Sequence, residues 1–288
     1  MTHCAVALPL LLVLSASAPG QPARELRARF ETRIRSIAAQ VDGVVGYEIV
    51  DLTSNERVAS LERETFPTAS AIKLAIVYEL FKQAGEGRLK LDETLTLDRS
   101  KAVGGSGVLV HMGTPTLSLR DYATLMVTLS DNTATNVLID RLGMADITRR
   151  MQQLGLPGTL LRRHMMDGAA ARRGDENVST PGELVALLKA LQAMPDAITL
   201  LKLPKENRLR RGLPPGVESA DKSGELDGVR VDAGLVFLKN RPYAFAVMTT
   251  YLMNDAEGER AITEMSRVTY EYFERLATGG VAGRRIGR

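Results

Sequence analysis

The feature that most constrains the fold of this chain is a segment after Ser70 that reads as a helix apolar on nearly all sides. Its apolar residues are Ile72, Leu74, Ala75, Ile76, Val77, Leu80 and Phe81. A helix with apolar residues all round lies in the interior of a protein rather than on its surface. Gly85 and Gly87 mark its end, because glycine favours helix termination. The rest of the chain must therefore supply elements that surround this helix.

The segments near the two ends of the chain predict strands. Residues 44–51 and 57–61 read as an antiparallel pair, and residues 229–238 and 243–252 as a second pair, because each is rich in strand-forming residues and bounded by turn residues. We expect the two pairs to form one sheet, since both lie outside the central, mostly helical stretch.

Helical patterns flank these strands. Residues 23–40 carry apolar side chains at spacings of three and four, and residues 257–276 read as a closing helix. With 288 residues, of which 44% are apolar, the chain can bury a sizeable core. The prediction is an α+β fold: an antiparallel sheet built from the N- and C-terminal segments, with flanking helices and an inserted, mostly helical subdomain. Residues 23–65 and 206–276 would form the α/β subdomain, residues 66–205 the helical subdomain, and residues 277–288 a loose tail.

Lys73 is out of place in such a buried helix. Burying an unpaired ammonium is costly, so a lysine in the first turn of a core helix favours a function over a surface role. Ser70 and Lys73 are three residues apart and share one helix face. A serine hydroxyl becomes a good nucleophile when a nearby base takes its proton. Taken alone, Ser70 would read as a simple helix cap; together with Lys73 it predicts a nucleophile and its base.

Two further motifs follow in the sequence. Ser70-Ala71-Ile72-Lys73 is followed by Ser130-Asp131-Asn132 and then by Lys222-Ser223-Gly224. In this order the three resemble the S-x-x-K, S-D-N and K-[ST]-G motifs of the penicillin-recognising serine hydrolases, and their spacing is most similar to that of class A β-lactamases. A second S-x-x-K match, at Ser219 to Lys222, is interpreted as coincidence.

The resemblance implies a β-lactamase/transpeptidase-like fold and a role for each motif residue. Ser70 would attack the substrate carbonyl, Lys73 would act as its base, and Ser130 would relay a proton to the leaving nitrogen. The remaining residues would bind substrate: Asn132 its side-chain amide, Lys222 and Ser223 its carboxylate, and the backbone N–H groups of Ser70 and Glu225, next to Gly224, its oxyanion. Desolvation and the charge of Lys222 should both lower the pKa of Lys73 and favour the neutral amine.

One element of the class A pattern is missing. These enzymes carry E-x-x-L-N, whose glutamate activates the water that releases the acyl group, and this chain has no such motif. Counted back from Gly174-Asp175-Glu176, Met165 stands where the glutamate would be. Asp167 is the nearest acid and has two interpretations, a substitute base or a structural partner of Arg162, Arg163 or Arg172; we favour the structural one. Acylation is therefore predicted, whereas deacylation is expected to be slow.

Other classes of site find little support. Neither His111 nor His164 lies in a zinc-binding pattern, there is no P-loop, and no metal or cofactor is predicted. The net charge is +3 and the pI is near 9.0, but the basic residues are not concentrated into a nucleic-acid footprint.

Three functions remain: a β-lactamase, a cell-wall D,D-peptidase or transpeptidase, and a receptor that is acylated without turnover. The substrate would be a small β-lactam or a peptidoglycan-type peptide, and the chain is expected to be a monomer without a transmembrane segment.

Residues 1–18 read as an export signal. An apolar run from Ala5 to Leu14 precedes Ala16-Ser17-Ala18, which are small residues of the kind found at cleavage sites. The run is too short to span a bilayer. Cleavage would remove Cys4, the one cysteine, and leave a chain without disulfides. A periplasmic or secreted location is therefore predicted.

Overall fold

The computed structural model describes residues 21–280 and 283–284. Its centre is a five-stranded antiparallel sheet in the order β2-β1-β9-β8-β7. The strands are β1 (Val44–Asp51), β2 (Arg57–Ser60), β7 (Ser219–Leu226), β8 (Val229–Val236) and β9 (Tyr243–Thr250). Strand β1 pairs along its whole length with β9, which confirms that the two ends of the chain build one sheet.

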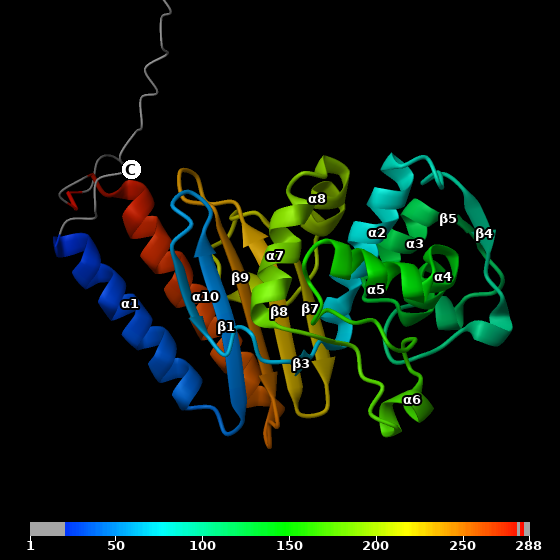
Figure 1. The fold of residues 1–288 in the computed structure, drawn as a ribbon, viewed down its shortest axis with the longest axis horizontal. Coiled ribbons are helices and arrows are strands. Elements are labelled where there is room, and N and C mark those ends of the chain that lie inside the picture. Colours follow the sequence, from blue (N-terminus) through cyan, green and yellow to red (C-terminus); the bar gives the residue numbers. More distant parts are fainter. Residues whose placement is uncertain (1–20, 281–282, 285–288) are drawn as a thin grey trace, which may run out of the picture.

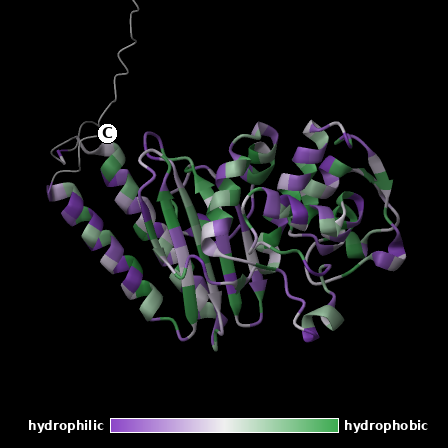
Figure 2. Ribbon diagram, in the orientation of Figure 1, coloured by the Kyte–Doolittle hydropathy of each residue, from purple (hydrophilic) through white to green (hydrophobic). Residues whose placement is uncertain are grey.

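Two long helices cover one face of this sheet. Helices α1 (Gln21–Ala39) and α10 (Asp255–Thr278) lie side by side there (Figure 1). Phe30 of α1 stacks on Tyr272 of α10 with ring centroids 4.2 Å apart, and Phe273 stacks on Tyr243 of β9. Figure 2 shows largely hydrophobic central strands, while α1 and α10 alternate hydrophobic and hydrophilic residues. This alternation explains how each helix buries one side only.

A helical block follows on the other side of the sheet (Figure 1). Its helices are α2 (Lys73–Gly85), α3 (Leu119–Thr128), α4 (Asn132–Leu142), α5 (Met144–Gln153), α6 (Gly168–Arg172), α7 (Pro181–Leu191) and α8 (Pro195–Lys202). The short helix α9 (Arg208–Arg211) instead packs against α10, and its Leu209 belongs to the hydrophobic cluster of α1 and α10. Shorter elements join them: β3 (Phe66–Pro67) with β6 (Val178–Ser179), β4 (Thr94–Thr96) with β5 (Thr116–Ser118), and the 3-10 turns Ala69–Ile72, Arg99–Lys101 and Leu109–His111.

Local signals account for several helix ends. Ser118 and Asp121 form a capping box at the start of α3, which satisfies two backbone N–H groups that the helix leaves free. Thr180 caps α7 through the N–H of Glu183, with Pro181 in the first turn. Gly143, at φ +89°, lies between α4 and α5.

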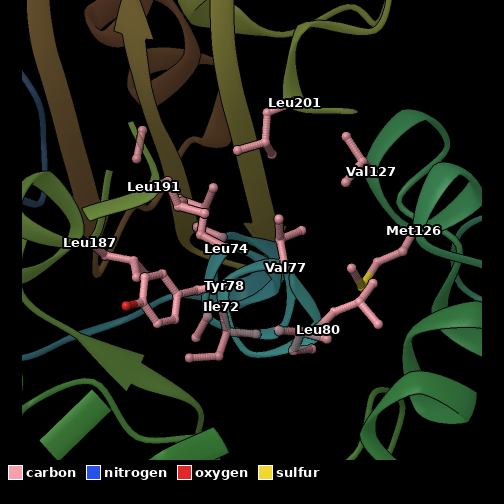
Figure 3. Packing of buried hydrophobic residues seen from close by; sticks show 14 of the residues in the cluster. Ile72, Leu74, Val77, Tyr78, Leu80, Met126, Val127, Leu187, Leu191 and Leu201 are labelled. Carbon is pink, nitrogen blue, oxygen red and sulfur yellow. The ribbon is translucent and has the colours of Figure 1, made fainter. Parts of the chain in front are cut away.

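Helix α2 is the centre of the larger hydrophobic core, as predicted. In Figure 3, Leu74, Val77 and Leu80 of α2 are surrounded by residues of three other helices. These are Met126 and Val127 of α3, Leu187 and Leu191 of α7, and Leu201 of α8. Leu74 is fully buried, so its truncation to alanine would cost about 2–5 kcal/mol of stability.

Two details of the motif placement come from the structure. Lys222, Ser223 and Gly224 lie inside β7, an edge strand that the sequence did not predict. Asn132 is the first residue of α4, which Asp131 caps through the N–H of Ala134.

The export signal at residues 1–18 lies outside the described residues, as does part of the tail at residues 277–288. The subdomain boundaries at residues 65/66 and 205/206 stay a prediction. Over residues 21–280 and 283–284, no single helix is long and apolar enough to cross a membrane; α7 and α8 together reach that length but are bent by 117°.

Candidate active site

Ser70 lies in a 3-10 turn, residues 69–72, that leads directly into α2. Thr68, not Ser70, occupies the cap position, and its side chain donates to the carbonyl of Asn177. Ala69 has a φ of +46°, a strained value for a residue with a side chain. The simple helix-cap interpretation of Ser70 is therefore wrong, and the serine sits at a strained entry to the core helix.

Gly224 brings strand β7 against this turn. A Cβ atom added to Gly224 would lie 2.4 Å from the carbonyl oxygen of Thr68 and 2.9 Å from the backbone nitrogen of Ser70. No side chain fits in that space, so only glycine allows the strand to approach the nucleophile this closely. The close approach places the backbone around Glu225 beside that of Ser70.

Lys73 is fully buried and points toward the second motif. Its Nζ donates to the carbonyl of Ser130 at 2.7 Å, to Ser130 Oγ at 3.0 Å and to Asn132 Oδ1 at 3.1 Å. Burial, and then the charge of Lys222, hold the pKa of Lys73 well below that of an ordinary lysine. The direction and both causes match the prediction.

Ser130 connects the two lysines. Its Oγ also accepts a hydrogen bond of 3.2 Å from Lys222 Nζ, which donates to the carbonyl of Ser223 at 2.8 Å as well. Burial, and then the charge of Lys205, lower the pKa of Lys222 to about 8. Two amines and one hydroxyl thus form a continuous chain, along which protons can move.

Asp131 and Asn132 hold a loop in place. The Asp131 carboxylate accepts the N–H groups of Val108 at 2.7 Å and Leu109 at 2.9 Å, and a Cβ at Gly107 would lie 2.2 Å from it. Asn132 Nδ2 donates to the carbonyl of Gly104. These contacts hold the loop at residues 104–109 in place.

One cavity of about 490 Å³ connects these groups. Of the predicted site residues it is lined by Ser70, Ser130, Lys222, Ser223 and Glu225, together with Gly105, Ser106, Val127, Thr128, Leu129, Lys205, Glu206, Leu226, Asp227, Arg230 and Asp255. Lys73, Asn132 and Gly224 lie behind its wall, Lys73 and Asn132 through the hydrogen bonds above and Gly224 through its close approach to Ser70. The structure therefore brings the three motifs together.

The buried charged residues behind β7, Arg208 and Asp232, were missed at the level of sequence. Behind β7, Arg208 is buried between Asp232, which it contacts through Nε at 3.0 Å, and Glu225, which it contacts through Nη1 at 3.1 Å. Burial raises the pKa of Asp232 to about 6, against the pull of Arg208. One signal was available: an aspartate in the middle of the apolar strand 229–236 requires a buried partner.

The loop around Met165 lacks an acid directed at the cavity. The Met165 side chain belongs to the large hydrophobic cluster, and its backbone is held by both amide atoms of Asn136. Asp167 caps α6, accepting the N–H of Ala170 at 2.9 Å, and this hydrogen bond lowers the pKa of Asp167. The favoured structural role takes a different form from the one expected: Arg163 pairs with Glu176, and Asp167 acts as a helix cap.

The described residues contain no cluster of three or more histidine, cysteine, aspartate or glutamate side chains that could hold a metal ion. What the site presents is a serine beside two lysines whose pKa values are lowered.

The fold is α+β, with a serine at the start of its core helix and a buried lysine one turn on. These features define the class of the protein as a serine hydrolase of the Ser–Lys type. Comparison with known proteins identifies the family within this class. The chain matches the β-lactamase enzyme family over residues 29–273, and it belongs to that family.

Individual relatives agree with this. A β-lactamase of Bacillus subtilis (strain 168) is 30% identical over 245 residues, which cover 79% of this chain and 78% of the relative. The crystal structure of a β-lactamase from Sphaerobacter thermophilus superposes with a TM-score of 0.78 at 26% identity, covering 86% of this chain and 97% of that one. A penicillin G acyl-enzyme complex of a PBP-A mutant gives the same TM-score and coverage at 30% identity.

Proposed function

We propose that this protein opens β-lactam rings through an acyl-enzyme on Ser70. The observation that carries the proposal is the chain from Lys73 through Ser130 to Lys222, placed beside Ser70 at one cavity. The supporting facts are the family membership and the lowered pKa of Lys73, which favours the neutral amine at neutral pH.

The acylation step assigns one task to each group. Neutral Lys73 takes the proton of Ser70 as Oγ attacks the ring carbonyl, and the oxyanion accepts the backbone N–H groups of Ser70 and Glu225. The C–N bond then breaks, and Ser130 passes a proton to the ring nitrogen. Lys222 and Ser223 bind the substrate carboxylate. Asn132 would bind the side-chain amide, and must release part of its contact with Lys73 or Gly104 to do so.

Deacylation is proposed to be the slow step. No carboxylate of the Met165–Asp167 loop lines the cavity, and Asp167 is engaged as a helix cap. General-base assistance contributes about 10²–10⁴-fold in rate, so water attack without it should lag well behind acylation. The same observation favours a second candidate, a cell-wall D,D-peptidase whose acyl group passes to an acceptor other than water.

The location, substrate class, oligomeric state and cofactor requirement of the enzyme are also proposals. The sequence of residues 1–18 supports export, to the periplasm or outside the cell. The small, polar cavity supports a low-molecular-weight substrate, either a β-lactam or a peptidoglycan-type peptide. A monomer and the absence of a cofactor complete the proposal.

Intact-mass time courses test the function. The full chain is mixed with a penicillin, a chromogenic cephalosporin or a peptide ending in D-Ala-D-Ala. A rapid rise to about one acyl equivalent followed by slow release indicates an accumulating acyl-enzyme. Turnover of the peptide that exceeds turnover of either β-lactam would favour the peptidase. A chain that never gains mass and never consumes the cephalosporin contradicts the proposal.

A further inference from the structure

Ser223 and Glu225 occupy the same face of strand β7, because alternate residues of a strand point to the same side. Their register partners on β8 are Asp232 and Arg230. The hydroxyl of Ser223 is proposed to bind the substrate carboxylate. The same face of the strand therefore also carries the carboxylate of Glu225, two residues further on.

Arg208 lies beneath this face. Its Nε contacts Asp232 at 3.0 Å, its Nη2 contacts the carbonyl of Gly224 at 3.2 Å, and its Nη1 contacts Glu225 at 3.1 Å. The side chain of Arg208 is 2% exposed, whereas that of Glu225 is 60% exposed. The Glu225 carboxylate thus stands between the buried guanidinium and the open cavity, which Glu225 lines and Arg208 does not.

We propose that Glu225 is a specificity-determining residue that lowers the affinity of the site for anionic substrates, by occupying Arg208 and by facing the substrate carboxylate with a like charge. This inference rests on the proposed function for its substrate class. An arginine beside the catalytic strand would otherwise offer a charge-assisted hydrogen bond to a carboxylate held at Ser223. With Asp232 and Glu225 both in contact with Arg208, two carboxylates oppose its single positive charge.

Glu225 acts against anionic substrates in two ways: it occupies Arg208, and it repels the substrate carboxylate. Glu206, Asp227 and Asp255 line the same cavity, against Lys205, Lys222 and Arg230. With Glu225 the acids outnumber the bases by one, so the cavity as a whole does not favour anions. Lys222 remains the group that attracts a carboxylate, and Glu225 sets how strongly the site holds it.

The test compares penicillin G with its uncharged methyl ester in binding to Ser70→Ala, a background in which no acyl bond can form. We would measure both dissociation constants by ligand-observed NMR, without and with Glu225→Gln. The expected result is a rise of about ten-fold in the preference for the acid over the ester, the lower end of what a hydrogen bond to a charged group contributes. The ester is the internal reference, so any effect of the substitution on both ligands cancels.

Asp227→Asn is the matched control, because it removes one negative charge from the same cavity wall without touching Arg208. Its acid-to-ester preference should change by no more than about two-fold, the effect of a screened charge at longer range. An unchanged preference in Glu225→Gln, or an equal rise in Asp227→Asn, overturns the inference. These outcomes are independent of the proposed function, which fails instead if the wild-type chain forms no adduct on Ser70 with either compound.

Discussion

Two regions of the molecule differ in how their polar groups are held: the site built from the three motifs, and the loop at residues 165–167, none of which lines the cavity. On one side, Lys73, Ser130 and Lys222 are linked by hydrogen bonds of 3.0 and 3.2 Å and are carried by the core helix, its neighbouring loop and the sheet edge. On the other side, the loop at residues 165–167 offers a buried methionine, and an aspartate that caps a five-residue helix.

The two regions bear on different half-reactions, acylation and deacylation. Forming the acyl-enzyme needs a base of lowered pKa, and burial at Lys73 supplies it. Releasing the acyl group needs a base beside a water, and in the loop the one nearby acid serves local structure instead. We therefore expect this site to be acylated faster than it is deacylated. Each of the following experiments strengthens or removes that contrast.

The largest effect is expected from Ser70→Ala. Without the Oγ nucleophile no acyl bond can form, so the mass increase with penicillin should vanish, and the labelled tryptic peptide should be lost. Ser106→Ala is the control, because Ser106 lines the same cavity and should keep the adduct. An adduct that survives in Ser70→Ala, or that maps to Ser106 or Ser219, would refute the assignment.

Lys73→Ala should lower the acylation rate by about 10²–10⁴-fold, the range for loss of a general base. The loss should be equal for penicillin G and its methyl ester, since both need the same proton transfer. Lys222→Ala should instead weaken mainly the carboxylate form. Stopped-flow acylation with both compounds separates the two lysines, and an identical pattern for the two variants would show that their roles are not divided.

Met165→Glu should speed deacylation, because it adds a carboxylate to the loop at residues 165–167. A carboxylate at this position is expected to raise the release rate after the burst by at least about ten-fold, part of the contribution of a general base. Burial among apolar neighbours would cost stability, so the Tm of each variant is measured first. Met165→Gln is the neutral control of the same shape. A release rate that is equal in both variants would mean that the loop does not limit deacylation.

The pH dependence of acylation should follow Lys222. Its pKa of about 8 means that the ammonium that binds a carboxylate is present below pH 8 and is lost as the pH rises through that value. The acylation efficiency for penicillin G should therefore fall above pH 8, while that for the methyl ester should not. Lys205→Gln removes the neighbouring like charge and should move the fall to higher pH. A fall shared by acid and ester would assign it to another group.

The smallest effect is expected at Asp167. Turnover in Asp167→Asn should stay within two-fold of the wild type, because the asparagine still caps α6 and no catalytic carboxylate is lost. Asp167→Ala should lower the Tm while Asp167→Asn should not. A slower release phase with an unchanged burst in Asp167→Asn would make Asp167 the deacylation base. The loop at residues 165–167 would then supply a base for deacylation, as Lys73 does for acylation.

The sequence by itself determined the order of the main elements and the burial of α2. These follow from local patterns: the apolar residues of the helix at 72–81, and the strand-forming segments bounded by turn residues near the two ends of the chain. It also determined the three motifs, because their residue types are unusual for where they occur, a buried lysine above all.

The tertiary structure alone decided which polar residues meet. Strand β7 was missed because Ser219 to Gly224 shows no alternation of apolar and polar residues, and an edge strand is defined by its pairing with β8 rather than by its own pattern. Glu225 came to lie on Arg208, 17 residues away in the chain, for the same physical reason. Hydrogen bonds between groups far apart in the chain depend on how the elements pack, and no local pattern encodes that distance.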